Sequence, residues 1–271
     1  MHSESPVNLD IAPLERTLGV VAKELARCDK PGHGPYASIT SRNASAPSGC
    51  PVCAEDARRV ADEAEQGEQQ ARIARERMER RLGAAMIPKR FQGKSFAAFR
   101  AETADQQQAL RICQGYAEQF PENYRAGRCL LLLGTVGTGK THLSAAILDM
   151  VISRHGMLGV YRTVTSILQY VKGSYDHAAS YSEAEAFQAL VAPHLLVIDE
   201  AGATKATEFE LATLFTVING RYEQQKPTIV ISNLELDGLH RAIGDRCVDR
   251  LREGGGRMVP FKWASARRGE A

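Results

Sequence analysis

The stretch that decides the fold reads Gly134-Thr135-Val136-Gly137-Thr138-Gly139-Lys140-Thr141. Its spacing, G-x-x-x-x-G-K-T, is that of the phosphate-binding P-loop. An apolar run over residues 128–133 precedes it, and a segment with the pattern of a packed helix begins at His142. Because a P-loop joins a buried strand to a helix, the motif and its flanks together predict a nucleotide site over residues 134–142.

The residue types of this loop indicate how it would hold a nucleotide. Glycines let the backbone curl so that several N–H groups point at phosphate oxygens, and the following helix adds the positive end of its dipole. We expect Lys140 to reach the β- and γ-phosphates of ATP, and the Thr141 hydroxyl to ligate Mg²⁺.

A second motif supplies two acids. The apolar run 195–198 ends in Asp199 and Glu200. A buried parallel strand delivers such residues to the carboxyl edge of its sheet, where ligands bind in open α/β folds. We expect Asp199 to hold Mg²⁺ through water and Glu200 to act as the general base that orients the attacking water.

Two further features are candidates for catalysis. Asn233 ends the apolar run 228–232 and is a candidate partner for the γ-phosphate or the water; the alternative is a turn or capping asparagine. The segment 244–252 is expected to be a helix with Arg246 and Arg250 on one face. An arginine supplied by a neighbouring subunit can stabilise charge on the γ-phosphate. The alternative is salt bridging of these arginines with Asp245, Asp249 and Glu253.

The wider pattern after residue 128 is strand–helix alternation. We expect strands over 128–133, 158–163, 194–199, 227–232 and 257–262, with helices between them. Five strands joined by crossover helices predict an α/β fold with a five-stranded parallel sheet covered on both faces. A helix near 104–120 is expected to lead into this core.

Composition bounds the class of protein. The chain has 271 residues, 44% of them hydrophobic, and a net charge of +2, which gives no global basic field for nucleic acid. The length suits one good-sized domain with an appendage, or two small domains. The sequence lacks both an apolar run of about 18 residues and the features of a signal peptide. We therefore expect a cytoplasmic protein without membrane association.

The N-terminal region differs from the rest of the chain. Residues 1–27 have the apolar spacing of a short amphipathic helix, and residues 54–85 that of a long charged helix that Pro88 ends. We place a domain boundary near residue 86, giving an N-terminal region 1–85, which could pack on itself or dock on a partner, and an ATPase domain 86–271.

Between these helices lies a candidate Zn²⁺ site. Cys50 and Cys53 form a C-x-x-C pair, the half-site of many structural zinc sites, and Cys28 and His33 would complete a Cys₃His set. Alternatives are a free surface histidine in the Gly-His-Gly turn and a redox C-x-x-C pair. The other three cysteines, Cys113, Cys129 and Cys247, are expected to be buried small residues.

Residues 87–268 resemble the DnaC/IstB group of AAA+ ATPases, and DnaC-type loaders of the replicative helicase most closely. The resemblance is carried jointly by five segments that cover the two motifs and the end of the domain: Gly134–Thr141, Leu195–Gly202, Lys226–Asn233, Gly244–Leu251 and Val259–Ser265. Residues 1–85 depart from the best-known loader and look more like those of phage- and prophage-encoded relatives.

The resemblance implies roles for individual residues. Arg250 matches the arginine finger, with Arg246 beside it. Arg267 matches a second sensor arginine, although Ala264 and Ala266 stand where the family more often has an acid and Tyr. Thr207 and Phe209 match positions that contact single-stranded DNA; Phe209 would stack on a base, with a core phenylalanine as the alternative. The helix around Tyr170 and Lys172 lies where loaders insert a DNA-facing element.

The implied function is ATP-dependent loading of the replicative hexameric helicase onto single-stranded DNA. The loader would associate with itself through the ATP site, and its N-terminal region would grip the helicase. One alternative is a transposition helper of the IstB kind that binds duplex DNA and a transposase. Another is an adaptor that binds nucleotide without hydrolysing it.

Overall fold

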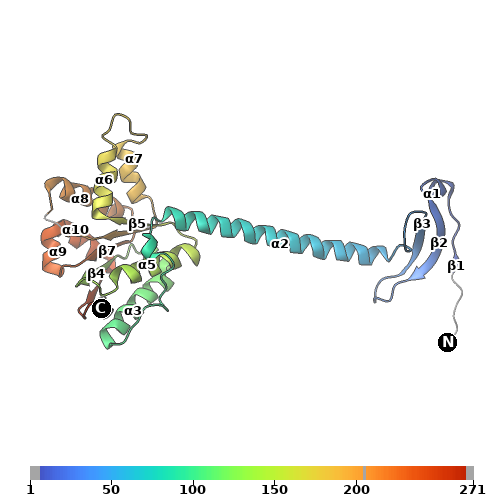
Figure 1. Cartoon of the computed structure of the whole chain (residues 1–271), viewed down its shortest axis with the longest axis horizontal. Coiled ribbons are helices and arrows are strands. Elements are labelled where there is room, and N and C mark those ends of the chain that lie inside the picture. The colour runs from blue at the N-terminus through green and yellow to red at the C-terminus, as the bar shows by residue number, and fades with distance from the viewer. Residues whose placement is uncertain (1–6, 204–205, 267–271) are drawn as a thin grey trace. The chain divides into compact units, whose positions relative to one another are not determined.

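The computed structural model describes residues 7–203 and 206–266. Contacts group the chain into two compact units, Met1–Ala74 and Arg75–Ala271. The larger unit contains a five-stranded parallel sheet in the order β5-β6-β7-β4-β8 (Figure 1). Its strands are β4 (Leu130–Gly134), β5 (Gly159–Thr163), β6 (Leu195–Asp199), β7 (Thr228–Ser232) and β8 (Arg257–Phe261). All five predicted strands are therefore confirmed.

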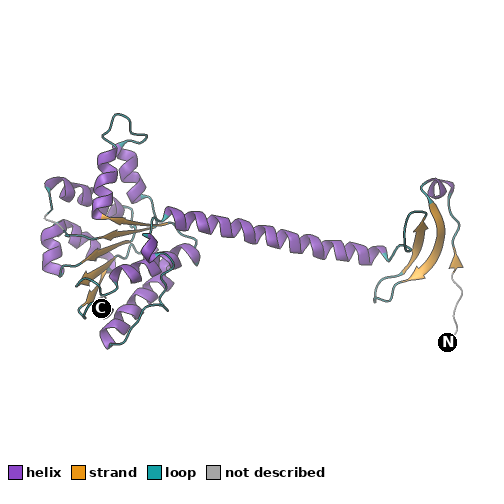
Figure 2. Cartoon of the chain, viewed as in Figure 1, coloured by secondary structure: helices purple, strands orange, loops and turns teal. Residues whose placement is uncertain are grey.

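The central strands β4, β6 and β7 are buried along almost their whole length and are mostly apolar, because both faces of the sheet are covered (Figure 2). Leu130 and Leu132 face one apolar layer, whereas Leu131 and Leu133 face the other. The first layer contains α3 (Ala104–Glu118), α4 (Phe120–Arg125) and α5 (Lys140–Ser153). The second contains α6 (Val164–Gly173), α7 (Glu183–Val191), α8 (Glu208–Glu223), α9 (Leu236–Ile243) and α10 (Asp245–Arg252).

The strand order brings the predicted motifs together. β7 lies between β4, which leads into the P-loop, and β6, which ends in Asp199. Since parallel strands end at the same edge of a sheet, the P-loop, Asn233 and the acidic pair share that edge. Two short 3-10 helices complete this unit, η1 (Lys89–Phe91) and η2 (Glu253–Gly255).

The N-terminal unit contains a sheet that the sequence did not predict. Strands β1 (Val7–Asn8), β2 (Val20–Arg27) and β3 (Pro35–Ser41) form an antiparallel sheet in the order β1-β2-β3. The predicted helix over residues 1–27 is wrong: within residues 7–27, only α1 (Pro13–Thr17) is helical. Gly19, with φ of +87°, follows the end of α1, and the residues after it pair with β3 instead of continuing the helix.

The predicted long helix is confirmed as α2 (Pro51–Ala84). It begins earlier than expected, since Pro51 suits the first turn of a helix. Its last turn and the next residue belong to the larger unit, within which Arg81 Nη1 donates to the Gly156 carbonyl at 2.6 Å and Tyr161 N donates to the Ala85 carbonyl at 2.8 Å. The boundary near residue 86 stays a prediction. None of the helices in the described part of the chain has the length and apolarity of a membrane span.

Candidate nucleotide-binding site

The backbone of the P-loop requires glycine at three positions. Gly134, Gly137 and Gly139 have φ of +138°, +79° and +94°, which side chains rarely adopt. A Cβ on Gly134 would lie 2.2 Å from the Phe261 carbonyl oxygen, and one on Gly139 would lie 2.5 Å from Phe99 Cε2. The loop is thus shaped by its glycines, and α5 begins directly after Gly139 with its N–H groups at the loop.

Lys140 and Thr141 occupy the first turn of α5. Lys140 is buried, and its Nζ donates to the carbonyl oxygens of Gly134 and Thr135 at 2.6 and 2.7 Å. The ammonium group therefore lies at the concave side of the loop, where phosphate oxygens are expected. Thr141 Oγ1 donates to Asp199 Oδ2 at 2.9 Å. The two motifs predicted to share a metal ion are in direct contact.

Asp199 is held by more groups than the sequence indicates. Tyr161 on β5 donates its hydroxyl to Asp199 Oδ2 at 2.5 Å, and the Glu200 N–H donates to Oδ1 at 2.6 Å. Burial raises the pKa of Tyr161 strongly, and the neighbouring Asp199 carboxylate raises it further, so the phenol stays a donor. Sequence reasoning missed Tyr161, since only the pairing of β5 with β6 places it beside Asp199.

Glu200 and Asn233 are exposed side chains on the wall of one cavity of about 360 Å³, which the P-loop also lines. Glu200 has φ of +62°, a left-handed conformation that is costly for a residue with a side chain and is typical of functional sites. The N-cap of α9 is Glu235, so Asn233 does not cap that helix. The capping alternative for Asn233 is therefore wrong.

Cationic and aromatic residues from the segment before α3 complete the cavity. Arg90, Phe91 and Lys94 line it together with the acidic pair. His142, on α5, contacts the Ser95 carbonyl through Nε2 at 2.9 Å and packs edge-to-face on Phe99, with ring centroids 5.5 Å apart. The run Lys89-Arg90-Phe91 was the available sequence signal, but no spacing ties it to the P-loop.

The segment after β8 forms hydrogen bonds with the P-loop. Trp263 Nε1 donates to the Thr138 carbonyl at 3.1 Å, and Thr135 Oγ1 donates to the Trp263 carbonyl at 3.2 Å. The Ala266 N–H donates to the Gly137 carbonyl at 3.0 Å. Three hydrogen bonds thus fix loop atoms that the motif alone leaves open. Arg267, the predicted second sensor, lies outside the described residues.

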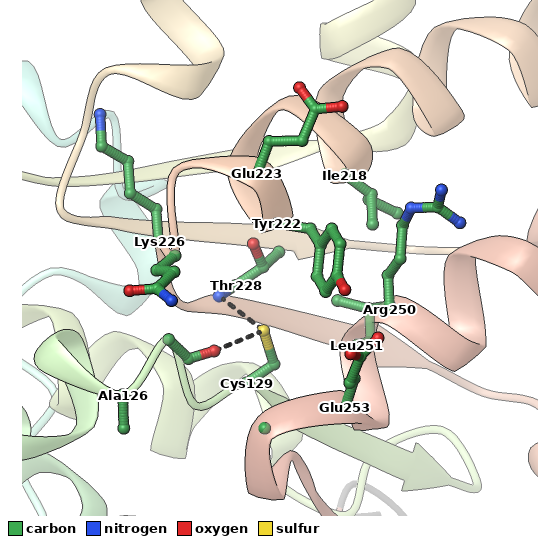
Figure 3. Close-up of a pocket in the computed structure, with 13 residues that line it drawn as sticks. Ala126, Cys129, Ile218, Tyr222, Glu223, Lys226, Thr228, Arg250, Leu251 and Glu253 are labelled. Carbon is green, nitrogen blue, oxygen red and sulfur yellow. Dashed lines mark hydrogen bonds between the residues drawn. The ribbon is translucent and has the colours of Figure 1, made fainter.

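Arg246 and Arg250 lie on α10 and do not line the cavity of their own chain. Arg250 instead borders a separate pocket of about 320 Å³ with Tyr222, Cys129 and Glu253 (Figure 3).

Within residues 7–203 and 206–266, neither Arg246 nor Arg250 forms an ion pair, and Asp245 pairs with His240 at 2.8 Å instead. The salt-bridging alternative is therefore not supported.

The residues predicted to face DNA meet where α6 and α8 pack together. Thr207 is the N-cap of α8, and its hydroxyl accepts from the Glu210 N–H at 3.2 Å. Phe209 is half-buried: it packs against the core, and its ring lies 5.1 Å from Lys172 Nζ. Tyr170, also on α6, stacks on Tyr181 with ring centroids 4.8 Å apart. The structure is therefore consistent with both interpretations of Phe209, as a core residue and as a partly exposed ring that could stack on a base.

In the N-terminal unit, Cys28, His33, Cys50 and Cys53 converge, with all ligand atoms within 4.8 Å of one another. His33 Nδ1 lies 3.5, 3.7 and 3.3 Å from the three sulfurs, and the Cys28 and Cys53 sulfurs are 3.5 Å apart. A tetrahedral zinc ion with ordinary bond lengths separates its ligands by about 3.6–3.8 Å. These residues therefore fit zinc, and His33 is not a free surface histidine.

The remaining cysteines differ from this cluster. Cys113, Cys129 and Cys247 are free and buried in the larger unit, as predicted. Burial raises the pKa of Cys113 to about 12 and that of Cys247 to about 11, so both stay neutral thiols. Cys113 and Cys247 act as small apolar residues, whereas the Cys129 sulfur accepts from the Thr228 N–H at 3.3 Å and donates to the Gly127 carbonyl at 3.6 Å.

Comparison with known proteins agrees with the geometry. The model of the IstB-like ATP binding protein family matches residues 60–251. The replicative helicase loaders DnaC of Buchnera aphidicola subsp. Schizaphis graminum and of Escherichia coli K12 are each 30% identical over 191 residues, which cover 70% of this chain and 76% of each loader. A crystal structure of the DnaC helicase loader superposes with a TM-score of 0.58 at 21% identity, covering 65% of this chain and all of that one. The chain therefore belongs to the family of IstB-like ATP binding proteins, has its AAA+ fold, and is homologous to the DnaC loaders.

Proposed function

We propose that the protein is an ATP-dependent loader of the replicative DNA helicase onto single-stranded DNA. The observation that carries the proposal is 30% identity to DnaC loaders over 76% of their length, in a chain whose P-loop, Asp199, Glu200 and Asn233 line one cavity. ATP binding and hydrolysis at this site would drive the loading cycle, and the similarity to DnaC loaders indicates that the loaded protein is the helicase.

Nucleotide binding rests on the P-loop. Backbone N–H groups of residues 134–139 and the start of α5 would hold the phosphates, and Lys140 would exchange its contacts with the loop carbonyls for phosphate oxygens. Thr141 and Asp199 fit Mg²⁺, since both offer oxygen atoms at the loop. The ion would supply charge neutralisation at the phosphates.

Hydrolysis rests on the acidic edge of the cavity. Glu200 is exposed to the cavity and would accept a proton from the attacking water as general base, whereas the buried Asp199 is occupied by Thr141 and Tyr161. Asn233, across the same cavity, would orient the water or the γ-phosphate. The two adjacent carboxylates would thus have different roles because Asp199 is buried and Glu200 is exposed.

Subunit contact rests on Arg250. It does not reach the cavity of its own chain, so it would act on ATP bound by a second copy, with Arg246 beside it on the same helix face. ATP would then join neighbouring subunits, and hydrolysis would release them. The DNA would lie against the start of α8 and α6, where Phe209 offers a half-buried ring beside Lys172.

The Cys₃His cluster would bind one structural Zn²⁺. The ion would fasten the loop after β2, which holds Cys28 and His33, to the first turn of α2, which holds Cys53. His33 Nε2 lies 3.7 Å from Asp56 Oδ2, the outer carboxylate that often orients a ligating histidine. The ion would thereby hold the partner-binding region together.

A transposition helper is the second candidate, because the matching family model is that of IstB-like proteins. The experiment that separates the two is co-purification with the replicative helicase of the same cell, with and without ATP. A complex that loads the helicase onto single-stranded DNA in the wild type, but not in Lys140→Ala, supports the loader. Binding to duplex DNA without any helicase complex would favour the transposition helper and overturn the loader.

A further inference from the structure

Arg250 lies in a cradle formed by one face of α8. Phe215, Asn219 and Tyr222 are spaced four and three residues apart, so their side chains share the helix face on which α10 packs. Arg250 Cζ lies 5.0 Å from the centroid of the Phe215 ring and 5.5 Å from that of Tyr222. Aromatic faces attract a guanidinium group without neutralising its charge.

Hydrogen bonds set the orientation of the guanidinium group within this cradle. Arg250 Nε donates to Asn219 Oδ1 at 2.7 Å, and Nη1 donates to the Arg246 carbonyl at 3.2 Å. Asn219 Nδ2 in turn donates to Glu223 Oε1 at 2.8 Å. Because Glu223 takes the amide nitrogen, the amide oxygen of Asn219 is the atom that faces Arg250.

The acceptors around Arg250 are neutral. Both hydrogen bonds of the guanidinium group go to amide oxygens, and within the described residues no carboxylate pairs with it. Nη2 donates no hydrogen bond in that part of the chain. In Figure 3 the two terminal nitrogens of the Arg250 guanidinium group point away from the Tyr222 ring, whereas Nε lies nearer to it. The cradle thus holds the stem and leaves the charge and one edge of the group for a ligand.

We infer that Asn219 and Tyr222 are positioning residues that hold Arg250 in the orientation required by the γ-phosphate of ATP on a second copy of the chain. The inference rests on the proposed action of Arg250 between subunits. A long arginine stem samples many rotamers, and a small misplacement of a charged group at a reaction centre costs large factors in rate. A preformed cradle removes that loss without a neutralising acid.

The test uses full-length protein with the variants Asn219→Ala, Tyr222→Ala and Arg250→Ala. Alanine suits a helix, so α8 is retained, and circular dichroism checks the fold. We expect about ten- to hundredfold lower ATP turnover in the two cradle variants, with unchanged ATP affinity. Tyr222→Phe keeps the ring and should restore most of the turnover. Thr216→Ala, at an exposed position on α8, is the matched control.

Mixing subunits separates positioning from damage to the nucleotide site. Lys140→Ala subunits cannot turn over ATP but still offer Arg250, whereas Asn219→Ala subunits keep an intact P-loop. Turnover should therefore return when the two variants are mixed. Failure of rescue, or wild-type turnover by both cradle variants while Arg250→Ala is inactive, overturns the cradle. Wild-type turnover by Arg250→Ala would instead overturn the proposed action of Arg250 between subunits.

Discussion

The two units of the chain differ in what stabilises each of them internally. In the larger unit, Arg75–Ala271, here called the nucleotide unit, a parallel sheet is buried between two apolar layers of helices. In the described part of Met1–Ala74, by contrast, Cys50 is the one buried apolar residue, and Val7, Leu14, Leu18, Val21 and Leu25 are exposed. A three-stranded sheet without an apolar core is marginal in water. We therefore expect a zinc ion bound by the four Cys and His side chains to stabilise this unit in place of an apolar core.

The largest expected effect is the loss of structure in the N-terminal unit, while the nucleotide unit stays folded. In Cys50→Ser, we expect bound zinc to fall from one ion per chain to none, and amide protection in β2 and β3 to be lost. Zinc binding contributes about 10–16 kcal/mol in small zinc domains, more than this sparsely buried unit can otherwise supply. Elemental analysis and hydrogen exchange measure the two quantities.

The control for this prediction is Cys247→Ala, whose sulfur is buried in the nucleotide unit. That variant should keep one zinc ion per chain. A metal-free wild-type protein with protected β2 and β3 amides would contradict the zinc site.

The next effect acts on the nucleotide unit alone. Glu200→Gln removes the proposed base without changing shape, and we expect ATP turnover to fall by about 10²–10⁴-fold while ATP affinity and zinc content stay the same. Steady-state turnover and equilibrium binding measure this. Glu118→Gln, an exposed acid on α3, should behave as wild type. Unchanged turnover in Glu200→Gln would assign the base elsewhere.

A smaller effect sharpens the account of Asp199. Tyr161→Phe removes the donor to Asp199 Oδ2, so we expect the free energy of unfolding to fall by about 1 kcal/mol. We also expect half-maximal turnover to need about tenfold more Mg²⁺, since outer partners orient metal ligands. The measurement is turnover against Mg²⁺ concentration. Tyr116→Phe loses a similar hydroxyl contact, to the Arg128 carbonyl at 2.8 Å, and neither residue lines the nucleotide cavity. Equal Mg²⁺ shifts in both variants would rule out this role.

The smallest effect concerns the brace on the P-loop. Trp263→Phe keeps an aromatic ring against Phe261 but removes the donor to the Thr138 carbonyl. Loss of one such hydrogen bond is worth about 1 kcal/mol, so we expect ATP affinity to weaken by about fivefold. Titration with a fluorescent ATP analogue measures it. Unchanged affinity would show that the loop holds its shape without this segment.

Prediction succeeded where the signal is local. The five strands of the parallel sheet could be located because a strand covered on both faces must be apolar throughout, as Leu195–Asp199 is almost to its end. It failed over residues 1–27, where apolar spacing matched a helix but β2 pairs with β3 across a loop. A sheet depends on a partner strand that no short window contains.

The sequence by itself determined the chemistry: the glycines of the loop, the lysine, the adjacent acids, and the four zinc-type ligands are all recognisable from residue type and spacing. Only the tertiary structure decided their surroundings. It placed Tyr161 on Asp199, Trp263 on the P-loop, and Asn219 and Tyr222 around Arg250. The physical reason is that these contacts join segments far apart in the chain, so strand order and helix packing set them, and no local pattern encodes either.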